Sequence, residues 1–239
     1  MHKSSGQNMP SKNHTNINPS AFFIDLILYL AVMFLIREVY FQDFHFIANG
    51  LFWSLSTLIV ATWRMHARGI SWKDLGLCKP EKYKTALIAT AFIFIFTVIS
   101  IIVFQAIMEQ FPGVLKADVS NETAVSKFGN LSGNWLLFLT IIPFVLLQSM
   151  LEELLDRGFL INWIERMFSS TLFATIFAVI AQALIFGFRH SYDISERSIS
   201  VAIIGLVMGI GYVAFGRNLW PLIIAHCVLN TMSMLDRVT

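Results

Sequence analysis

Two adjacent glutamates lie inside an apolar run of the chain, where a charged side chain needs a partner or a function. The run SMLEELLDRGFL holds Glu152, Glu153, Asp156 and Arg157. A charge at the centre of a membrane helix costs about 2.5–3.5 kcal/mol on insertion scales. Positions four apart share a helix face, so we expect Glu153 to pair with Arg157 and Glu152 to face Gln148. The alternative is a helix end in the cytoplasm, which fits less well because apolar residues continue on both sides.

A second polar group, Phe186-Gly-Phe-Arg-His190, closes the next apolar run. We expect residues 135–167 and 171–190 to form a helical hairpin. Glu152 then lies about 17 residues before the turn and His190 about 20 residues after it, so at 1.5 Å per residue their depths differ by only about 5 Å. The sequence therefore predicts that the Glu152 carboxylate and the His190 imidazole meet across the hairpin.

A third polar group lies in the middle of the last apolar run, WPLIIAHCVLNTM. His226 and Asn230 are one helical turn apart and share a face of the helix. Each needs a hydrogen-bond partner, because hydrocarbon offers no water to replace one. The alternative to a functional role is a structural hydrogen bond between helices.

A glutamate, two histidines and an asparagine in one cavity could together hydrolyse an amide bond. They would supply a general base, a partner that positions water, and donors to a developing oxyanion. Other arrangements for proteolysis in a membrane are missing from the sequence, which contains no His-Glu-x-x-His segment and no Gly-x-Gly-Asp segment.

The composition shows what kind of element must position these residues. Of the 239 residues, 56% are hydrophobic and 13% are charged, whereas an ordinary soluble domain is about one quarter charged. The mean hydropathy of +0.67 agrees with an integral membrane protein. A net charge of +2 is too small to suggest a nucleic-acid partner, and two cysteines provide no disulfide framework.

Long apolar runs predict an all-α fold, a polytopic membrane bundle of about seven helices within a range of six to eight. The region 135–167 would count as two crossings if it broke at Pro143. We expect a disordered polar tail over 1–19 and a single integral membrane domain over 20–235, with the catalytic core at about 135–232. The predicted spans are 20–36, 44–63, 85–108, 135–167, 171–190, 198–216 and 218–235.

Basic residues predict the orientation of the bundle. The connector 64–84 holds the densest group of them: Arg64, Arg68, Lys73, Lys79, Lys82 and Lys84. Cytoplasmic loops carry an excess of Lys and Arg, so we place this connector and the N-terminus in the cytoplasm. The segment 109–134 is poor in Lys and Arg and is expected outside.

Three motifs in this order resemble the CPBP family. They are Glu152-Glu153-x-x-x-Arg157 followed by Gly158, Phe186-x-x-x-His190, and His226-x-x-x-Asn230. The family includes the type II CAAX prenyl endopeptidases and the Abi and lysostaphin-resistance proteins. The resemblance covers about 135–232, and the segment Asn218-Leu-Trp-Pro221 before His226 is also common in the family.

The resemblance implies a role for each residue. Glu152 would activate water with His190 as its partner, and His226 and Asn230 would stabilise the oxyanion. Glu153 and Arg157 would form an ion pair that shapes the site together with Phe186. Asp156 departs from the pattern, because family members usually carry an aromatic residue there. This acid would either repel Glu152 or be neutralised by Arg157.

The resemblance also leaves a zinc site open, because Glu152, His190 and His226 could form a His2-Glu set. We favour no cofactor, since Asn230 suits an oxyanion role better than a ligand role. The expected partners are membrane lipid and a membrane-associated or lipidated protein or peptide, and the expected location is a bacterial plasma membrane. Two other classes are a non-catalytic immunity or binding protein of the same fold and a transporter, although no inverted repeat is apparent.

Overall fold

The computed structural model describes residues 19–116, 128–168 and 171–239, and every regular element within them is a helix. The all-α prediction is confirmed, whereas the predicted tail lies outside the described residues except at its last position. The elements are α1 (Pro19–Leu35), η1 (Ile36–Glu38), α2 (Phe46–Ala67), α3 (Tyr83–Gln110), α5 (Trp135–Glu152), η2 (Glu153–Ile161), α6 (Asn162–Met167), α7 (Leu172–Ser191), α8 (Glu196–Ala214) and α9 (Trp220–Asp236).

Six helical runs in the described residues are long and apolar enough to cross a membrane. Helix α9, with 17 residues, is the seventh long helix of the described residues, so the helices fall within the predicted range of six to eight. The run Trp135–Met167 is one continuous unit of 33 residues formed by α5, η2 and α6. Pro143 lies inside α5 without dividing it, so the expected alternative of two crossings is wrong.

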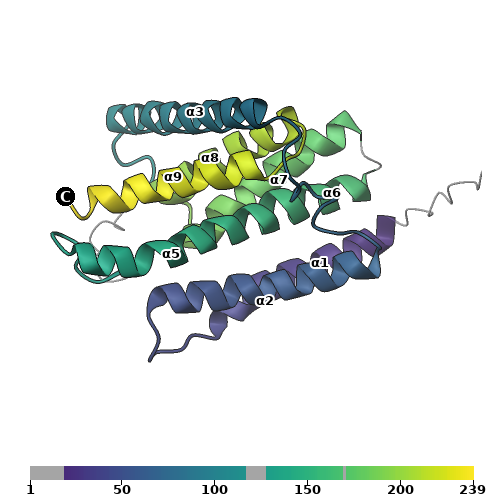
Figure 1. Ribbon diagram of the computed structural model, residues 1–239, viewed down its shortest axis with the longest axis horizontal. Coiled ribbons are helices and arrows are strands. Elements are labelled where there is room, and N and C mark those ends of the chain that lie inside the picture. Colours follow the sequence, from purple (N-terminus) through teal and green to yellow (C-terminus); the bar gives the residue numbers. More distant parts are fainter. Residues whose placement is uncertain (1–18, 117–127, 169–170) are drawn as a thin grey trace, which may run out of the picture.

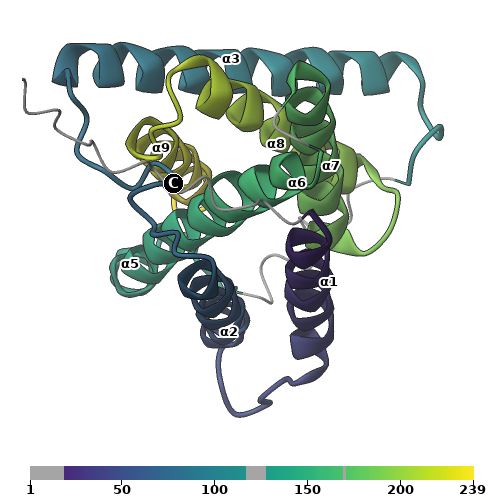
Figure 2. The same ribbon diagram turned by 90° about the vertical axis from the view of Figure 1, so that its right-hand side faces the viewer.

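The helices form a bundle in which α5, η2 and α6 lie at the centre (Figure 1). Helix α5 packs against α2 and α9, while α6 and η2 pack against α7, and α1 lies against α2 and α6. Figure 2 shows α3 crossing the top of the bundle at a steep angle, where it covers α8 and α9. The functional run is therefore surrounded by helices from both halves of the chain.

Small residues bring α7 and α8 into close contact. A Cβ atom added at Gly187 would lie 2.6 Å from the Cβ atom of Ala202, and one added at Gly205 would lie 3.2 Å from the Cα atom of Ala183. Such residues let membrane helices approach at their backbones. This contact fixes the end of α7, which carries His190.

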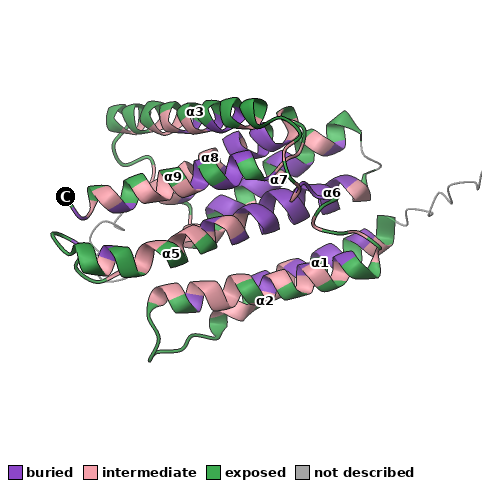
Figure 3. Ribbon diagram, in the orientation of Figure 1, coloured by how far each residue is buried: buried purple, intermediate pink, exposed green. Residues whose placement is uncertain are grey.

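Burial is concentrated inside the bundle (Figure 3), and many large apolar side chains are exposed on its outside. Every residue of η2 is buried, including its three charged residues. Helix α3 instead exposes Phe92, Ile95, Ile99 and Ile102 on its outer side. A polar interior beneath an apolar surface is the arrangement expected of a protein surrounded by lipid.

Two groups of ion pairs lie at one end of the bundle. Arg64 and Arg68 both bind Asp25, at 2.7 and 2.8 Å, at the end of the bundle that carries the connector from α2 to α3. Arg217 binds Glu165 at 2.7 Å near the same end. The C-terminus lies at the opposite end (Figure 1).

Candidate functional site

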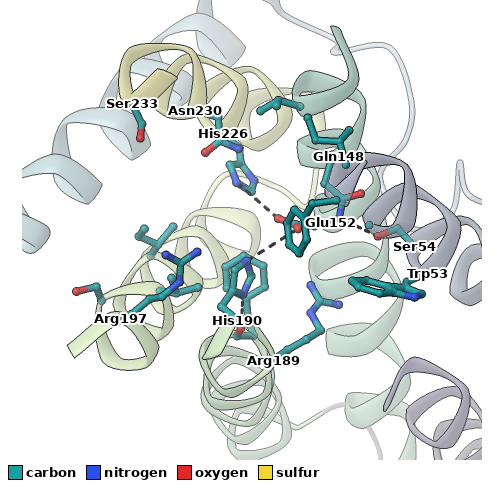
Figure 4. Close-up of a pocket in the computed structure, with 18 of the residues that line it drawn as sticks. Trp53, Ser54, Gln148, Glu152, Arg189, His190, Arg197, His226, Asn230 and Ser233 are labelled. Atoms are coloured by element: carbon teal, nitrogen blue, oxygen red, sulfur yellow. Dashed lines mark hydrogen bonds and ion pairs between the residues drawn. The ribbon is translucent and has the colours of Figure 1, made fainter. Parts of the chain in front are cut away.

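A cavity of about 530 Å³ inside the bundle brings together residues from most of the helices. Its lining includes four residues that the sequence analysis assigned to catalysis: Glu152, His190, His226 and Asn230. Figure 4 shows Glu152 between the two imidazoles, one from α7 and the other from α9. The predicted meeting of Glu152 with His190 is confirmed, since Oε1 and Nε2 lie 4.0 Å apart.

The carboxylate of Glu152 is positioned by hydrogen bonds along α5 and α2. It is the last residue of α5, and the Gln148 amide one turn earlier donates to its Oε1 at 3.0 Å. The same Gln148 nitrogen donates to Ser54 Oγ on α2 at 2.8 Å. Helix α2 therefore helps to fix the orientation of Glu152, although it lies far earlier in the chain.

The His190 imidazole presents its Nε2 atom to Glu152. Its Nδ1 lies 2.7 Å from the carbonyl oxygen of Phe186. A carbonyl can only accept a hydrogen bond, so Nδ1 carries the proton, and in the neutral ring Nε2 is the acceptor. The bond to the preceding turn thus selects the tautomer in which Nε2 can accept a proton from water.

The second imidazole, His226, lies between the two adjacent glutamates. Its Nδ1 is 2.7 Å from Oε1 of Glu153, and its Nε2 is 3.8 Å from Oε2 of Glu152. Glu153 also accepts a hydrogen bond from Arg157 at 3.0 Å, and both of these side chains are fully buried. The expected ion pair is present, and it additionally holds the ring of His226.

Phe186 packs against the charged and imidazole groups of the site. The Arg157 guanidinium lies 4.4 Å from the centre of its ring, and that of Arg189 lies 5.5 Å away. Its ring centre is 4.6 Å from that of His190 and 6.4 Å from that of His226. Aromatic faces attract cations, and this ring helps to hold both arginines beside the site.

Asn230 lies on α9 one turn after His226 and lines the cavity. Its amide nitrogen donates to Ser149 Oγ at 2.8 Å. A side-chain amide carries two hydrogens, so one remains for a further acceptor. Ser149 on α5 therefore fixes the direction in which Asn230 can donate.

The helix widens at the residues that carry the charges. From Glu153 to Ile161 the backbone forms a π-helix rather than the α-helix that the sequence analysis assumed. Such wide turns are rare and occur frequently at functional sites. Here the stretch begins directly after Glu152 and includes Glu153, Asp156 and Arg157.

Asp156 has a partner that the sequence analysis did not foresee. Its Oδ2 binds Arg189 of α7 at 2.7 Å, whereas Arg157 is bound to Glu153. The sequence analysis offered repulsion of Glu152 or neutralisation by Arg157 as alternatives, and the direct ion-pair partner of Asp156 is instead Arg189. Arg189 stood in the sequence directly before His190, and a charge in an apolar run was the signal that could have identified it. Ser54 gave no comparable signal, because a serine in an apolar helix has many explanations.

A zinc ion at this site would be bound by Glu152, His190 and His226. Among the residues that the structure describes, however, no three His, Cys, Asp or Glu side chains are grouped closely enough to hold a metal ion. The mechanism proposed below involves no metal.

A bundle of apolar helices enclosing buried glutamates and histidines defines an integral membrane protein with a polar interior site. A family model described as "Type II CAAX prenyl endopeptidase Rce1-like" matches residues 134–232. This confirms the resemblance to the CPBP family, which supports a membrane endopeptidase as the general class. The matched segment contains the seven site residues predicted from the sequence. Searches of curated proteins and of solved structures each found no match.

Proposed function

We propose that this protein is a membrane-embedded endopeptidase in which Glu152 activates water to cleave a peptide bond. The observation that carries the proposal is the placement of the Glu152 carboxylate in the cavity, facing the Nε2 atoms of His190 and His226 at 4.0 and 3.8 Å. These separations are too long for direct hydrogen bonds and suit a bridging water.

In this mechanism a water molecule held by Glu152 and His190 attacks the carbonyl carbon of the substrate. Glu152 takes a proton as the new carbon–oxygen bond forms, and the electron pair of the carbonyl moves onto its oxygen. Asn230 and His226 donate hydrogen bonds to that oxyanion. Glu152 then gives its proton to the leaving amine as the carbon–nitrogen bond breaks.

Glu153 supports the part played by His226. Donation from Nε2 requires a protonated ring, because Nδ1 already carries the hydrogen that faces Glu153. A carboxylate 2.7 Å from Nδ1 accepts the hydrogen of that atom and fixes the orientation of the ring. Arg157 in turn holds the carboxylate, so the pair acts through His226.

Several residues that line the cavity lie at one end of the bundle. Its lining includes Arg37 directly after α1, Phe46 at the start of α2, Arg197 at the start of α8 and Arg237 directly after α9. These positions lie away from the basic connector between α2 and α3 (Figure 1). With that connector and the N-terminus in the cytoplasm of a bacterium, the site opens towards the outer side of the plasma membrane.

The proposed substrate is a membrane-associated or lipidated protein or peptide, with no nucleic acid and no metal cofactor involved. The test compares protein termini in membranes of cells that express the wild-type chain or Glu152→Gln. New termini present only with the wild type support the proposal. Glu109→Gln, which removes an exposed carboxylate from the end of α3, serves as the matched control. Identical termini with wild type and Glu152→Gln would instead favour a non-catalytic binding protein.

A further inference from the structure

Arg197 differs in its contacts from the other arginines of the cavity. It lines the cavity from the first turn of α8. No hydrogen bond or ion pair joins it to the described part of the chain, and its Nε atom is buried without an acceptor. Arg157 and Arg189, by contrast, each bind a carboxylate.

The first turn of α8 is an unfavourable place for a positive charge. The N-terminus of a helix carries a partial positive charge, which stabilises acids and repels cations. The guanidinium points into the cavity beside His190 (Figure 4). A role in stabilising α8 therefore does not explain this residue, and its direction indicates a role in the cavity.

The lining of the cavity is strongly biased towards positive charge. Among the residues that the structure describes, the lining contains four arginines, Arg37, Arg189, Arg197 and Arg237, but a single carboxylate, that of Glu152. Glu152 already accepts a hydrogen bond from Gln148 and faces the two imidazoles. The described residues of the lining therefore provide no anion for Arg197.

Two other arginines of the lining bind no carboxylate in the described part of the chain, and both are engaged in a different way. The Arg237 guanidinium lies 5.8 Å from the ring centre of Phe128. Arg37 donates to the carbonyl oxygen of Arg189 at 2.7 Å. Its guanidinium also lies 4.8 Å from the ring centre of Trp53 and 4.6 Å from that of Tyr192. These contacts hold Arg37 in place, and of the four arginines Arg197 alone has no such contact within residues 19–116, 128–168 and 171–239.

We propose that Arg197 binds a carboxylate of the substrate and thereby selects peptides with an acidic group at a fixed distance from the cleaved bond. The planar guanidinium matches a carboxylate with two parallel hydrogen bonds. A peptide whose carbonyl lies at Glu152 would extend past His190 to this position. The inference rests on the proposed function, because it names the chemistry that the same site recognises.

The test uses the purified full-length protein in detergent with a defined library of synthetic peptides, and mass spectrometry identifies the products. The wild type should cleave peptides with an acidic group at one position relative to the new terminus. Arg197→Gln should lower the cleavage of those peptides by about tenfold or more, since a charge-assisted bond is lost. Arg197→Glu should shift the preference at that position to Lys or Arg, whereas Arg197→Lys should keep the preference for an acid.

The carboxylate could belong to an Asp or Glu side chain or to the C-terminus of the peptide. Matched peptides with free and amidated C-termini separate these sources. If amidation removes cleavage, Arg197 binds the terminal carboxylate. If amidation has no effect while replacement of an internal acid by its amide does, Arg197 binds a side chain.

Controls distinguish failure of this inference from failure of the proposed function. Lys116→Gln removes a positive charge near the start of α8 from a residue that does not line the cavity, and it should cleave as the wild type does. Unchanged preferences in Arg197→Glu and Arg197→Gln, with Glu152→Gln inactive, would overturn the role of Arg197 alone. Equal product sets from the wild type and Glu152→Gln would overturn both proposals. Size-exclusion profiles establish that each variant is folded. If Arg197→Gln and Arg197→Glu do not fold, Arg197→Lys, which keeps the charge, provides the test.

Discussion

The Nδ1 atom of His226 lies 2.7 Å from Oε1 of Glu153, and the same carboxylate accepts a hydrogen bond from Arg157. The first of these contacts joins α9 to η2, and the second lies within η2. The glutamate next to the proposed base is thus a structural and electrostatic partner of the second imidazole. Loss of Glu153 should affect both stability and chemistry, and the two effects can be separated.

Breaking the buried Glu153–Arg157 pair on one side should destabilise the protein. Glu153→Ala leaves Arg157 charged and without a partner, which typically costs about 3–5 kcal/mol. Replacing both residues with leucine removes both charges and should recover much of the stability. Activity should stay low in the double variant, because His226 loses the carboxylate that orients it. Thermal unfolding in detergent measures the first effect, and peptide cleavage measures the second. Equal stability of the single and double variants would contradict the claim that Glu153 and Arg157 depend on each other as a buried ion pair.

The elements of the site were more predictable from the sequence than their contacts. Apolar runs gave the helices, and the rise per residue gave the depth at which Glu152 meets His190. The Asp156–Arg189 bond was not predictable in this way, because it depends on the rotation of α7 against η2. The contact of Ser54 with Gln148 likewise depends on the packing of α2 on α5. Sequence spacing does not determine how distant helices rotate against each other, and it gave no sign of the π-helix.

Removing the proposed base should abolish catalysis and leave the fold intact. Glu152→Gln keeps the size of the side chain and an oxygen that can accept from Gln148, but it cannot take a proton. We expect kcat to fall by about 10²–10⁴, the range typical of general acid–base catalysis. Purified protein and a cleaved peptide provide the measurement, with Glu109→Gln as the control. A kcat within a few-fold of the wild type would exclude Glu152 as the base.

The arrangement of α5 and α7 can be tested by cross-linking. Cysteines at Glu152 and His190 should react together with a short bifunctional reagent, because the two side chains face one another. A pair at Leu139 and His190 is the control, since Leu139 lies on an exposed part of α5 more than three turns before Glu152. Similar yields from both pairs would mean that the two helices do not pack as described.

Loss of the Asp156 charge should disturb the end of α7. Asp156→Asn leaves Arg189 with 11% of its side chain exposed and no carboxylate to bind. We expect a less stable protein and reduced cleavage, because Arg189 directly precedes His190. The double variant Asp156→Leu with Arg189→Leu should recover part of the stability. Asp43→Asn, an exposed site in the loop before α2, should change neither property. If Asp156→Asn unfolds at the same temperature as the wild type, the Asp156–Arg189 pair contributes little to the stability of the protein.

Removal of metal ions tests the proposed chemistry against zinc catalysis. In the proposed mechanism a glutamate takes the proton from water, and the oxyanion is stabilised by Asn230 and His226. Purified protein treated with a chelator should therefore keep its rate of peptide cleavage, and added zinc should not raise that rate. Asn230→Ala should lower kcat by about 10²-fold or more, as expected when an oxyanion donor is lost. Metal content and cleavage are measured on the same sample, before and after treatment. Activity that disappears with the metal and returns with zinc would assign Glu152, His190 and His226 as ligands and replace the glutamate mechanism.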